Sequence, residues 1–168
     1  FAWKAILAVI LSFLGIFIYI VFRFRKWQFG LGATVALLHD VLVVIAIFSI
    51  FYGVMPFSME IDQAFIAAIL TVIGYSINDT VVVFDRIREY HVRFKRKERK
   101  ELIDHALNST LSRTINTSLT TFFVLLMIFL FGGEVIRGFV FAIMLGVVVG
   151  TYSSLCIATP IVIDLVKE

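Results

Sequence analysis

The sequence predicts an all-helical integral membrane protein, a bundle of five transmembrane helices. Hydrophobic residues make up 61% of the 168 residues and charged residues only 16%, whereas a soluble domain carries about half apolar and about a quarter charged residues. Five stretches contain the roughly 20 mainly apolar residues that a bilayer-spanning helix needs. We therefore expect a single transmembrane domain over residues 1–168. Since the first residue is Phe1, we also expect the chain to be part of a longer protein.

Polar or helix-breaking residues separate the five expected spans. The spans run over about residues 5–22, 29–55, 64–84, 111–131 and 135–166, and a basic polar loop covers about residues 85–110. Pro56 is a natural stop for the second span. The last stretch is long for one span, so we expect it to tilt or to kink near Pro160, whose ring removes a backbone hydrogen bond.

The basic residues predict the orientation. If the spans alternate, one side of the membrane carries nearly all of them: Arg23, Arg25, Lys26, the cluster from Arg86 to Lys100, and Lys167. By the positive-inside rule that side is cytoplasmic, which puts the N-terminus outside and the C-terminus inside. The basic cluster could instead bind nucleic acid or anionic lipid. Tyr90 and Phe94 are the only aromatic residues among its charges, too few for base stacking, so we expect no nucleic-acid partner.

Two ionisable residues in neighbouring spans form the candidate site. Asp79 lies well inside the third span, where an ionisable group is costly and therefore a candidate for function. Arg113 opens the antiparallel fourth span at a similar expected depth. We expect the pair to close when Asp79 is ionised and to open when it is protonated, which frees Arg113 to turn toward Thr117 or water. A static pair that locks the two helices explains these residues equally well.

Further polar residues support this candidate site. On the fourth span they follow Arg113 at offsets of 3, 4, 7 and 8, which puts them on one helical face that we expect to look into the bundle. On the second span, Asp40 lies beside His39 and is either a proton-relay member or, as we prefer, part of a hydrogen-bonded pair. No metal-ligand spacing, phosphate loop or nucleophilic triad stands out, so we expect no cofactor other than the proton. The supporting polar residues are Asn116, Thr117, Thr120 and Thr121 on the fourth span, Tyr75 and Asn78 on the third, and Asp40.

Small residues recur every fourth position along the fifth span. They are Gly138, Ala142, Gly146, Gly150 and Ser154. Such a stripe lets two helix backbones approach closely, and close packing drives helix association in lipid. The expected partner is the third helix, the fourth helix, or a helix outside this chain.

The stretch from Gly74 to Glu89, GYSINDTVVVFDRIRE, resembles the signature of the SecF family of bacterial protein-export membrane proteins, which belongs to the RND superfamily. The segments at Leu38–Val41, Arg113–Thr114 and Leu130–Gly133 are also similar to this family. The resemblance covers nearly the whole chain, although Phe1–Lys26 matches mainly by hydropathy.

The resemblance implies more than the residues themselves show. Family members have six spans per half and a large periplasmic domain between the first two, so this chain would supply the last five spans. They reside in the bacterial inner membrane and work with SecD, either separate or fused upstream. With the SecYEG translocon, they assist the export of preproteins by using the proton gradient. The resemblance assigns proton coupling to Asp79, Arg113 and Thr117.

Other functions remain open at the level of sequence. Asp40 and Asp79 could be the paired carboxylates of an intramembrane aspartyl protease, but neither lies in a Gly-x-Gly-Asp motif and Arg113 would have no role. An RND-type small-molecule exporter and a purely structural scaffold are further alternatives. We expect a transport subunit and no enzymatic activity.

Overall fold

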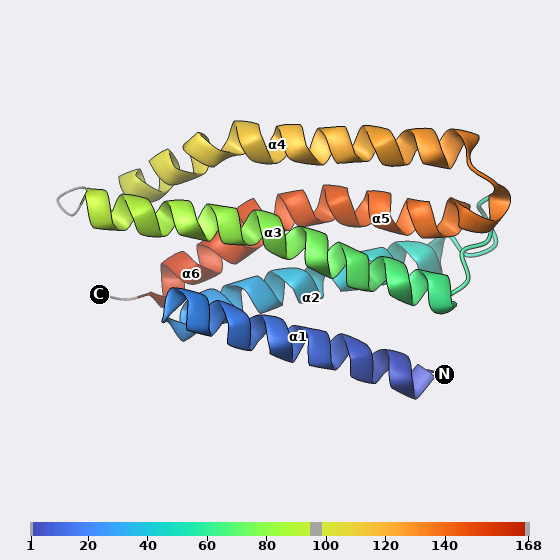
Figure 1. Ribbon diagram of the computed structural model, residues 1–168, viewed down its shortest axis with the longest axis horizontal. Coiled ribbons are helices and arrows are strands. Elements are labelled where there is room, and N and C mark those ends of the chain that lie inside the picture. Colours follow the sequence, from blue (N-terminus) through green and yellow to red (C-terminus); the bar gives the residue numbers. More distant parts are fainter. Residues whose placement is uncertain (1, 95–98, 167–168) are drawn as a thin grey trace.

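The computed structural model describes residues 2–94 and 99–166, and these residues form helices packed side by side (Figure 1). They comprise α1 (Ala2–Phe24), α2 (Trp27–Ile50), α3 (Gln63–Arg93), α4 (Arg99–Phe131) and α5 (Glu134–Ser153), which continues through a π-helical turn, η1 (Ser154–Ala158), into α6 (Thr159–Leu165). Taken with α5 through α6 as one unit, five helices in the described part are long and apolar enough to cross a membrane. The predicted all-α, five-span fold is confirmed.

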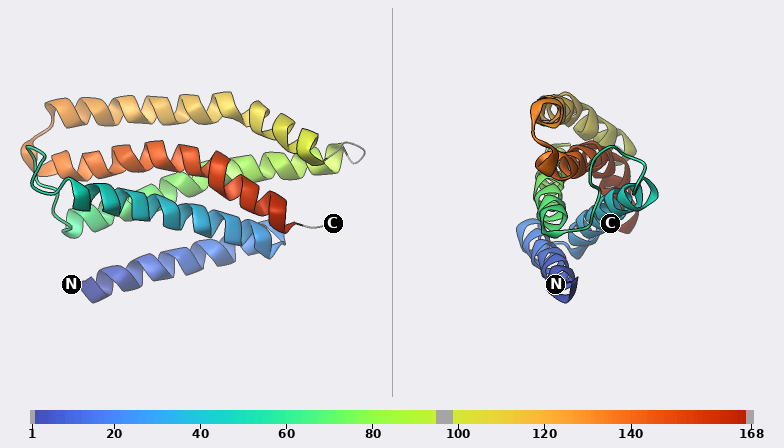
Figure 2. Two further views of the ribbon diagram at one scale, coloured as in Figure 1. Left: turned by 180° about the vertical axis from the view of Figure 1, so that it is seen from behind. Right: turned by 90° about the vertical axis from the view of Figure 1, so that its right-hand side faces the viewer.

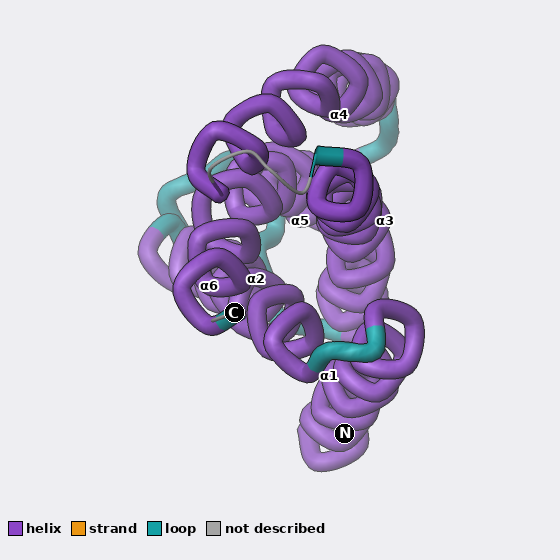
Figure 3. Tube along the Cα trace, turned by 90° about the vertical axis from the view of Figure 1, so that its left-hand side faces the viewer, coloured by secondary structure: helices purple, strands orange, loops and turns teal. Residues whose placement is uncertain are grey.

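The central helix of the bundle is α5. It packs against α2, α3 and α4, whereas α1 packs mainly on α2. Figures 2 and 3 show α1 and α4 at opposite edges of the bundle. The described N-terminus and C-terminus lie at opposite ends of the bundle, and the α1–α2 turn lies at the C-terminal end (Figure 1). Which of these ends faces the cytoplasm stays a prediction.

The boundary between α2 and α3 differs from the expected one. The structure ends α2 at Ile50, before the expected end at residue 55, and the connection that follows contains Gly53 with a φ of 76°. Glycine has no Cβ and adopts this left-handed conformation without steric cost. Asp62 then caps α3, because its carboxylate accepts a hydrogen bond from the backbone N–H of Phe65 at 2.8 Å.

Most of the expected polar loop over residues 85–110 is helical. The structure extends α3 to Arg93 and begins α4 at Arg99. The first turns of α4 are amphipathic, and Leu102, Ile103 and Ala106 are buried. Burial of this apolar face explains why the segment is ordered as helix although its composition is polar. The position of the membrane surface along α3 and α4 remains a prediction.

The last span departs from α-helical geometry next to Pro160. The π-helical turn η1 covers Ser154–Ala158, and α6 begins at Thr159. Proline has no N–H to donate to the preceding turn. The Thr159 hydroxyl donates to the Ser154 carbonyl oxygen at 3.0 Å and supplies one hydrogen bond there. Figure 2 shows α6 inclined to α5 at this point.

The buried apolar residues form two clusters, one toward each end of the bundle. Phe48 and Phe65 belong to the first, and their rings lie 4.6 Å apart between centroids. Three phenylalanines, Phe24, Phe29 and Phe84, join α1, α2 and α3 in the second, with centroid separations of 5.0–5.8 Å. The buried residues of α3 that lie between the two clusters are polar.

Candidate functional site

A layer of buried polar side chains lies between the two apolar clusters. On α3 the first cluster ends at Ile73 and the second begins at Val83, and Ser76, Asp79 and Thr80 fall between them. Water is excluded from a bundle core in a membrane, so these groups need partners within the protein. The layer comprises the buried residues Asp40 of α2, Ser76, Asp79 and Thr80 of α3, Ser118 of α4, Ser153 of α5 and Ser154 of η1, together with the half-buried Thr151 of α5.

Asp79 joins α3 to α4 and α5. Its side chain is buried, with 4% of the residue exposed. The Ser118 hydroxyl donates to Oδ2 of Asp79 at 3.4 Å, and the Thr151 hydroxyl donates in turn to Ser118. Three helices therefore meet at one carboxyl group through two hydroxyl groups.

Arg113 does not form the expected closed pair with Asp79 in this structure. Within the described residues, no ion pair joins the two side chains. Arg113 is exposed, and its charge acts on Asp79 only through a longer-range electrostatic interaction. The reason is the rotation of α4, which turns Thr110, Thr114 and Ser118 toward the bundle. Arg113 is one residue away from Thr114, about 100° around the helix.

The polar stripe expected to look into the bundle is largely exposed, which corrects the sequence-based prediction. Asn116, Thr117 and Thr120 are exposed, and Thr121 is half-buried. The hydroxyls of Thr117, Thr120 and Thr121 each donate to a carbonyl oxygen of the preceding turn at 2.9 Å. Such bonds satisfy threonine within its own helix. Among these side chains, Thr121 also accepts a hydrogen bond from the Tyr75 hydroxyl at 3.4 Å.

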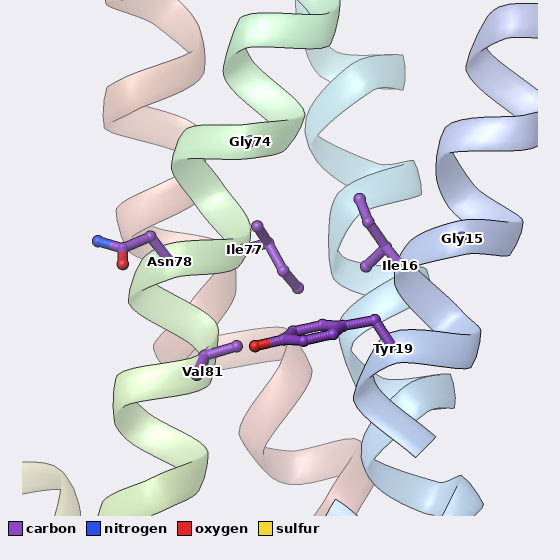
Figure 4. A pocket seen from close by; sticks show the side chains of 7 residues that line it. All are labelled: Gly15, Ile16, Tyr19, Gly74, Ile77, Asn78 and Val81. Carbon is purple, nitrogen blue, oxygen red and sulfur yellow. The ribbon is translucent and has the colours of Figure 1, made fainter. Parts of the chain in front are cut away.

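Asn78 lies on a different side of α3, at a groove facing α1. The groove is lined by Gly15, Ile16 and Tyr19 of α1 and by Gly74, Ile77, Asn78 and Val81 of α3. Figure 4 shows the Tyr19 hydroxyl directed toward α3, whereas the Asn78 amide points away from α1. Asn78 is exposed and does not share the surroundings of Asp79.

Asp40 is the most enclosed carboxyl group of the described chain, with 0% of the residue exposed. Its Oδ2 accepts a hydrogen bond from the Ser76 hydroxyl at 2.7 Å, and its Oδ1 lies 3.3 Å from Nδ1 of His39. Ser153 of α5 also lies next to this carboxyl group and interacts with it. Asp40 therefore connects α2 with both α3 and α5.

The small residues of α5 face several elements. The Ser58 carbonyl oxygen lies where a Cβ of Gly138 would stand, and Ala142 is fully buried in the first apolar cluster. Gly146 lies against Val72, and Gly150 against Ser76. One turn further, the Ser154 and Thr80 hydroxyls are 2.9 Å apart. Over these last three turns the neighbour of the stripe is α3.

Five residues of this layer escaped the sequence reasoning: Ser76, Thr80, Ser118, Thr151 and Ser153. Thr110, Thr114 and Ser118 recur every fourth residue, as do Ser76 and Thr80, and this spacing of small polar residues was the available signal. No described group of three His, Cys, Asp or Glu side chains could hold a metal ion.

Comparisons with known proteins agree on one family. Residues 1–168 match the family described as "Protein export membrane protein SecD/SecF, C-terminal". The chain is 56% identical to protein translocase subunit SecF of Rhodothermus marinus over 161 residues, which is 96% of this chain and 52% of that protein. It is 48% identical to protein translocase subunit SecDF of Brucella abortus, covering 95% of this chain and 20% of that protein.

A solved structure shares both the fold and the sequence. The crystal structure of SecDF, a translocon-associated membrane protein from Thermus thermophilus, superimposes with a TM-score of 0.84 at 41% identity. The match covers 95% of this chain and 21% of that one. The chain thus spans about half the length of the SecF relative from Rhodothermus marinus and about a fifth of the SecDF proteins.

Proposed function

The chain belongs to the SecD/SecF family of protein-export membrane proteins, and on that premise we propose that it is the transmembrane part of a SecF-type translocase subunit. In this role it assists Sec-dependent protein export across the bacterial inner membrane. Its partners are SecD, the SecYEG translocon and the exported preproteins. The names of the relatives support the export role, and the SecDF relatives support association with SecD.

The proton-motive force drives this activity through Asp79. The observation that carries the proposal is a carboxyl group that is buried within a span and holds only a hydroxyl partner, while a cation stands nearby but unpaired with it. An ionised carboxylate in such surroundings favours a cation partner, and a protonated one does not need it. Two arrangements follow: protonated Asp79 hydrogen-bonded to Ser118, and ionised Asp79 paired with Arg113.

A switch between these arrangements moves α4 relative to α3. Arg113 is exposed, so its side chain has to turn toward the bundle to reach Asp79, and Ser118 then gives up its contact. Thr117, one turn along α4 on the same exposed side, offers the turning side chain a hydroxyl oxygen. The proton is the coupling ion and no other cofactor takes part. The movement of α4 relative to α3 is then transmitted to the parts of the full-length protein that lie outside this chain.

The exposed polar face of α4 supports SecD as the partner that covers it. An exposed arginine within a span is costly, about 2.5–3.5 kcal/mol at the bilayer centre on the insertion scale and less toward the end of a helix, where Arg113 is expected. The threonines of this face are satisfied within α4, whereas Arg113 and Asn116 present donors to whatever lies alongside. A second transmembrane domain with acceptors on its surface would remove that cost, and the remaining outer faces of α1 and α4 would contact lipid.

The protease alternative requires two carboxyl groups that share a water molecule. Asp40 and Asp79 instead have separate sets of partners, Ser76, Ser153 and His39 for the first and Ser118 for the second. The names of the relatives also argue against a small-molecule exporter. Export therefore remains the function that the observations support best.

The test is Asp79→Asn in the full-length protein, assembled with SecD. We expect the variant to insert into the membrane and to bind SecD, because asparagine keeps the shape and still accepts from Ser118. Stimulation of preprotein export by an imposed proton gradient should be lost. The matched control is Asp104→Asn, which removes the same charge from an exposed position of α4 and should leave stimulation unchanged. Full stimulation by Asp79→Asn would refute the proposed coupling.

A further inference from the structure

The second buried carboxyl group, Asp40, is not used by the coupling described above. Its surroundings are hydroxyl groups from two other helices, Ser76 of α3 and Ser153 of α5, together with His39 of its own helix. In the described part of the chain, His39 is the one group whose charge acts on Asp40. Among the described residues, no lysine or arginine balances a negative charge at Asp40.

Counting hydrogens around Asp40 indicates which form of the carboxyl group fits. A serine hydroxyl carries a single hydrogen, and a carboxylate can only accept. The Ser153 hydroxyl lies 3.2 Å from the Gly150 carbonyl oxygen and also next to Asp40, so a Ser153 that keeps its bond to Gly150 has only a lone pair to offer Asp40. A protonated Asp40 donates to that lone pair and still accepts from Ser76 at 2.7 Å. An ionised Asp40 can bond to Ser153 only if that hydrogen leaves the Gly150 carbonyl oxygen, so the protonated form keeps one more hydrogen bond.

His39 provides a route for a proton between Asp40 and the surface of the bundle. Its side chain is 35% exposed, whereas the Asp40 side chain is 1% exposed, so the imidazole separates the carboxyl group from the surface of the bundle. The ring lies near Tyr152, with centroids 6.3 Å apart. Imidazole accepts a proton on one nitrogen while it gives one up at the other, which suits it to proton transfer.

We propose that Asp40 is a second proton-binding group of this domain, protonated in the present conformation and exchanging its proton with the surface through His39. When the proton leaves, the carboxylate becomes an acceptor only. Ser153 then has to turn its hydrogen away from Gly150 toward Asp40. For this transfer the carboxyl hydrogen turns from Ser153 to the Oδ1 side. Nδ1 of His39, in the tautomer with its hydrogen on Nε2, takes it up while Nε2 releases its own hydrogen, so only Asp40 changes charge.

The position of Ser153 gives this exchange a structural consequence. It is the last residue of α5 before the π-helical turn η1, and Ser154 also donates to the Gly150 carbonyl oxygen, at 2.8 Å. Thr151, two residues earlier, connects to Asp79 through Ser118. Both carboxyl groups therefore act on the same segment of α5. π-Helical turns within α-helices occur frequently at functional sites.

Infrared spectroscopy of the full-length protein, reconstituted with SecD at neutral pH, tests the proton on Asp40 directly. The carbonyl stretching band of a protonated carboxyl group should be lost in Asp40→Asn and retained in Asp79→Asn. If the difference between wild type and Asp40→Asn contains only carboxylate bands, the proposal is overturned. The band reports the proton and not export, so this result is independent of the function proposed above.

Two further variants keep Asp40 in place. Ser153→Ala removes the proposed acceptor and should shift the frequency of the Asp40 band, and an unshifted band contradicts the hydrogen-bond assignment. His39→Gln should keep the band but slow its exchange in deuterated buffer by at least about tenfold, since a positioned acid–base group is lost. Exchange at the wild-type rate would overturn the role of His39.

Discussion

The close contact between α5 and α3 predicts that Gly146→Ala destabilises the protein. A Cβ on Gly146 would stand 2.8 Å from the Cβ of Val72 and closer still to its methyl groups. A change of rotamer relieves the methyl contacts but not the Cβ contact, because the backbone fixes the position of a Cβ atom. Ordinary contacts begin near 3.4 Å, so the two helices must separate by roughly 0.6 Å at this turn.

The expected size follows from two opposing effects. Inserting a methyl group into a packed interface costs about 1–3 kcal/mol. Replacing glycine by alanine inside a helix returns about 1 kcal/mol through helix propensity. The net loss at Gly146 is therefore about 1 kcal/mol. A separation at Gly146 also loosens the next turn, where Gly150 lies against Ser76, so the polar layer is weakened with the packing.

The matched control is Gly15→Ala on α1. A Cβ at Gly15 has no atom within 4 Å among the described residues, so only the propensity gain applies there. We expect the free energies of unfolding of the two variants to differ by about 2 kcal/mol, measured by equilibrium unfolding of the full-length protein in detergent. If Gly146→Ala is as stable as Gly15→Ala, the two helices do not pack as closely as described.

Two neighbouring turns of α4 predict effects of opposite sign in the same unfolding measurement. Thr114 is buried, and its hydroxyl has no hydrogen-bond partner among the described residues, so Thr114→Val should stabilise the protein by about 1 kcal/mol by removing an unpaired polar group. A loss of stability would show that the hydroxyl is satisfied. Ser118→Ala should instead cost about 1–3 kcal/mol, because Asp79 loses its donor. An unchanged stability would show that this hydrogen bond contributes nothing.

The sequence predicted the helices better than their ends. Length and hydropathy were sufficient to identify five spans, because a bilayer imposes a minimum length on each apolar run. The same measure could not tell that α3 and α4 extend far into the basic segment, since those turns are polar on one side and bury only a narrow face. Pro56 suggested where the second span stops, but the chain leaves the helix already after Ile50.

The site was predicted in part. Asp79 and Asp40 stood out because charge is rare within a span, and both are buried in the polar layer. Their partners Ser76, Ser118 and Ser153 did not stand out, because a serine in an apolar helix is common and its hydroxyl is often satisfied by the preceding turn. Only the packing of one helix against another decides which of these hydroxyls reaches a carboxyl group.

The rotation of α4 shows why the sequence of a membrane protein does not easily reveal which face of a helix points into the bundle. In water the apolar face of a helix marks the core, but lipid is as apolar as the core, so both sides of α4 carry leucine and phenylalanine. We expected the larger polar residues, Arg113 and Asn116, to mark the inner face. The helix instead buries its small polar residues, Thr110, Thr114 and Ser118. Small hydroxyl residues allow close approach. Thr110 is satisfied within its own helix and Ser118 reaches Asp79, whereas the larger polar groups are left on the face that a second domain would cover.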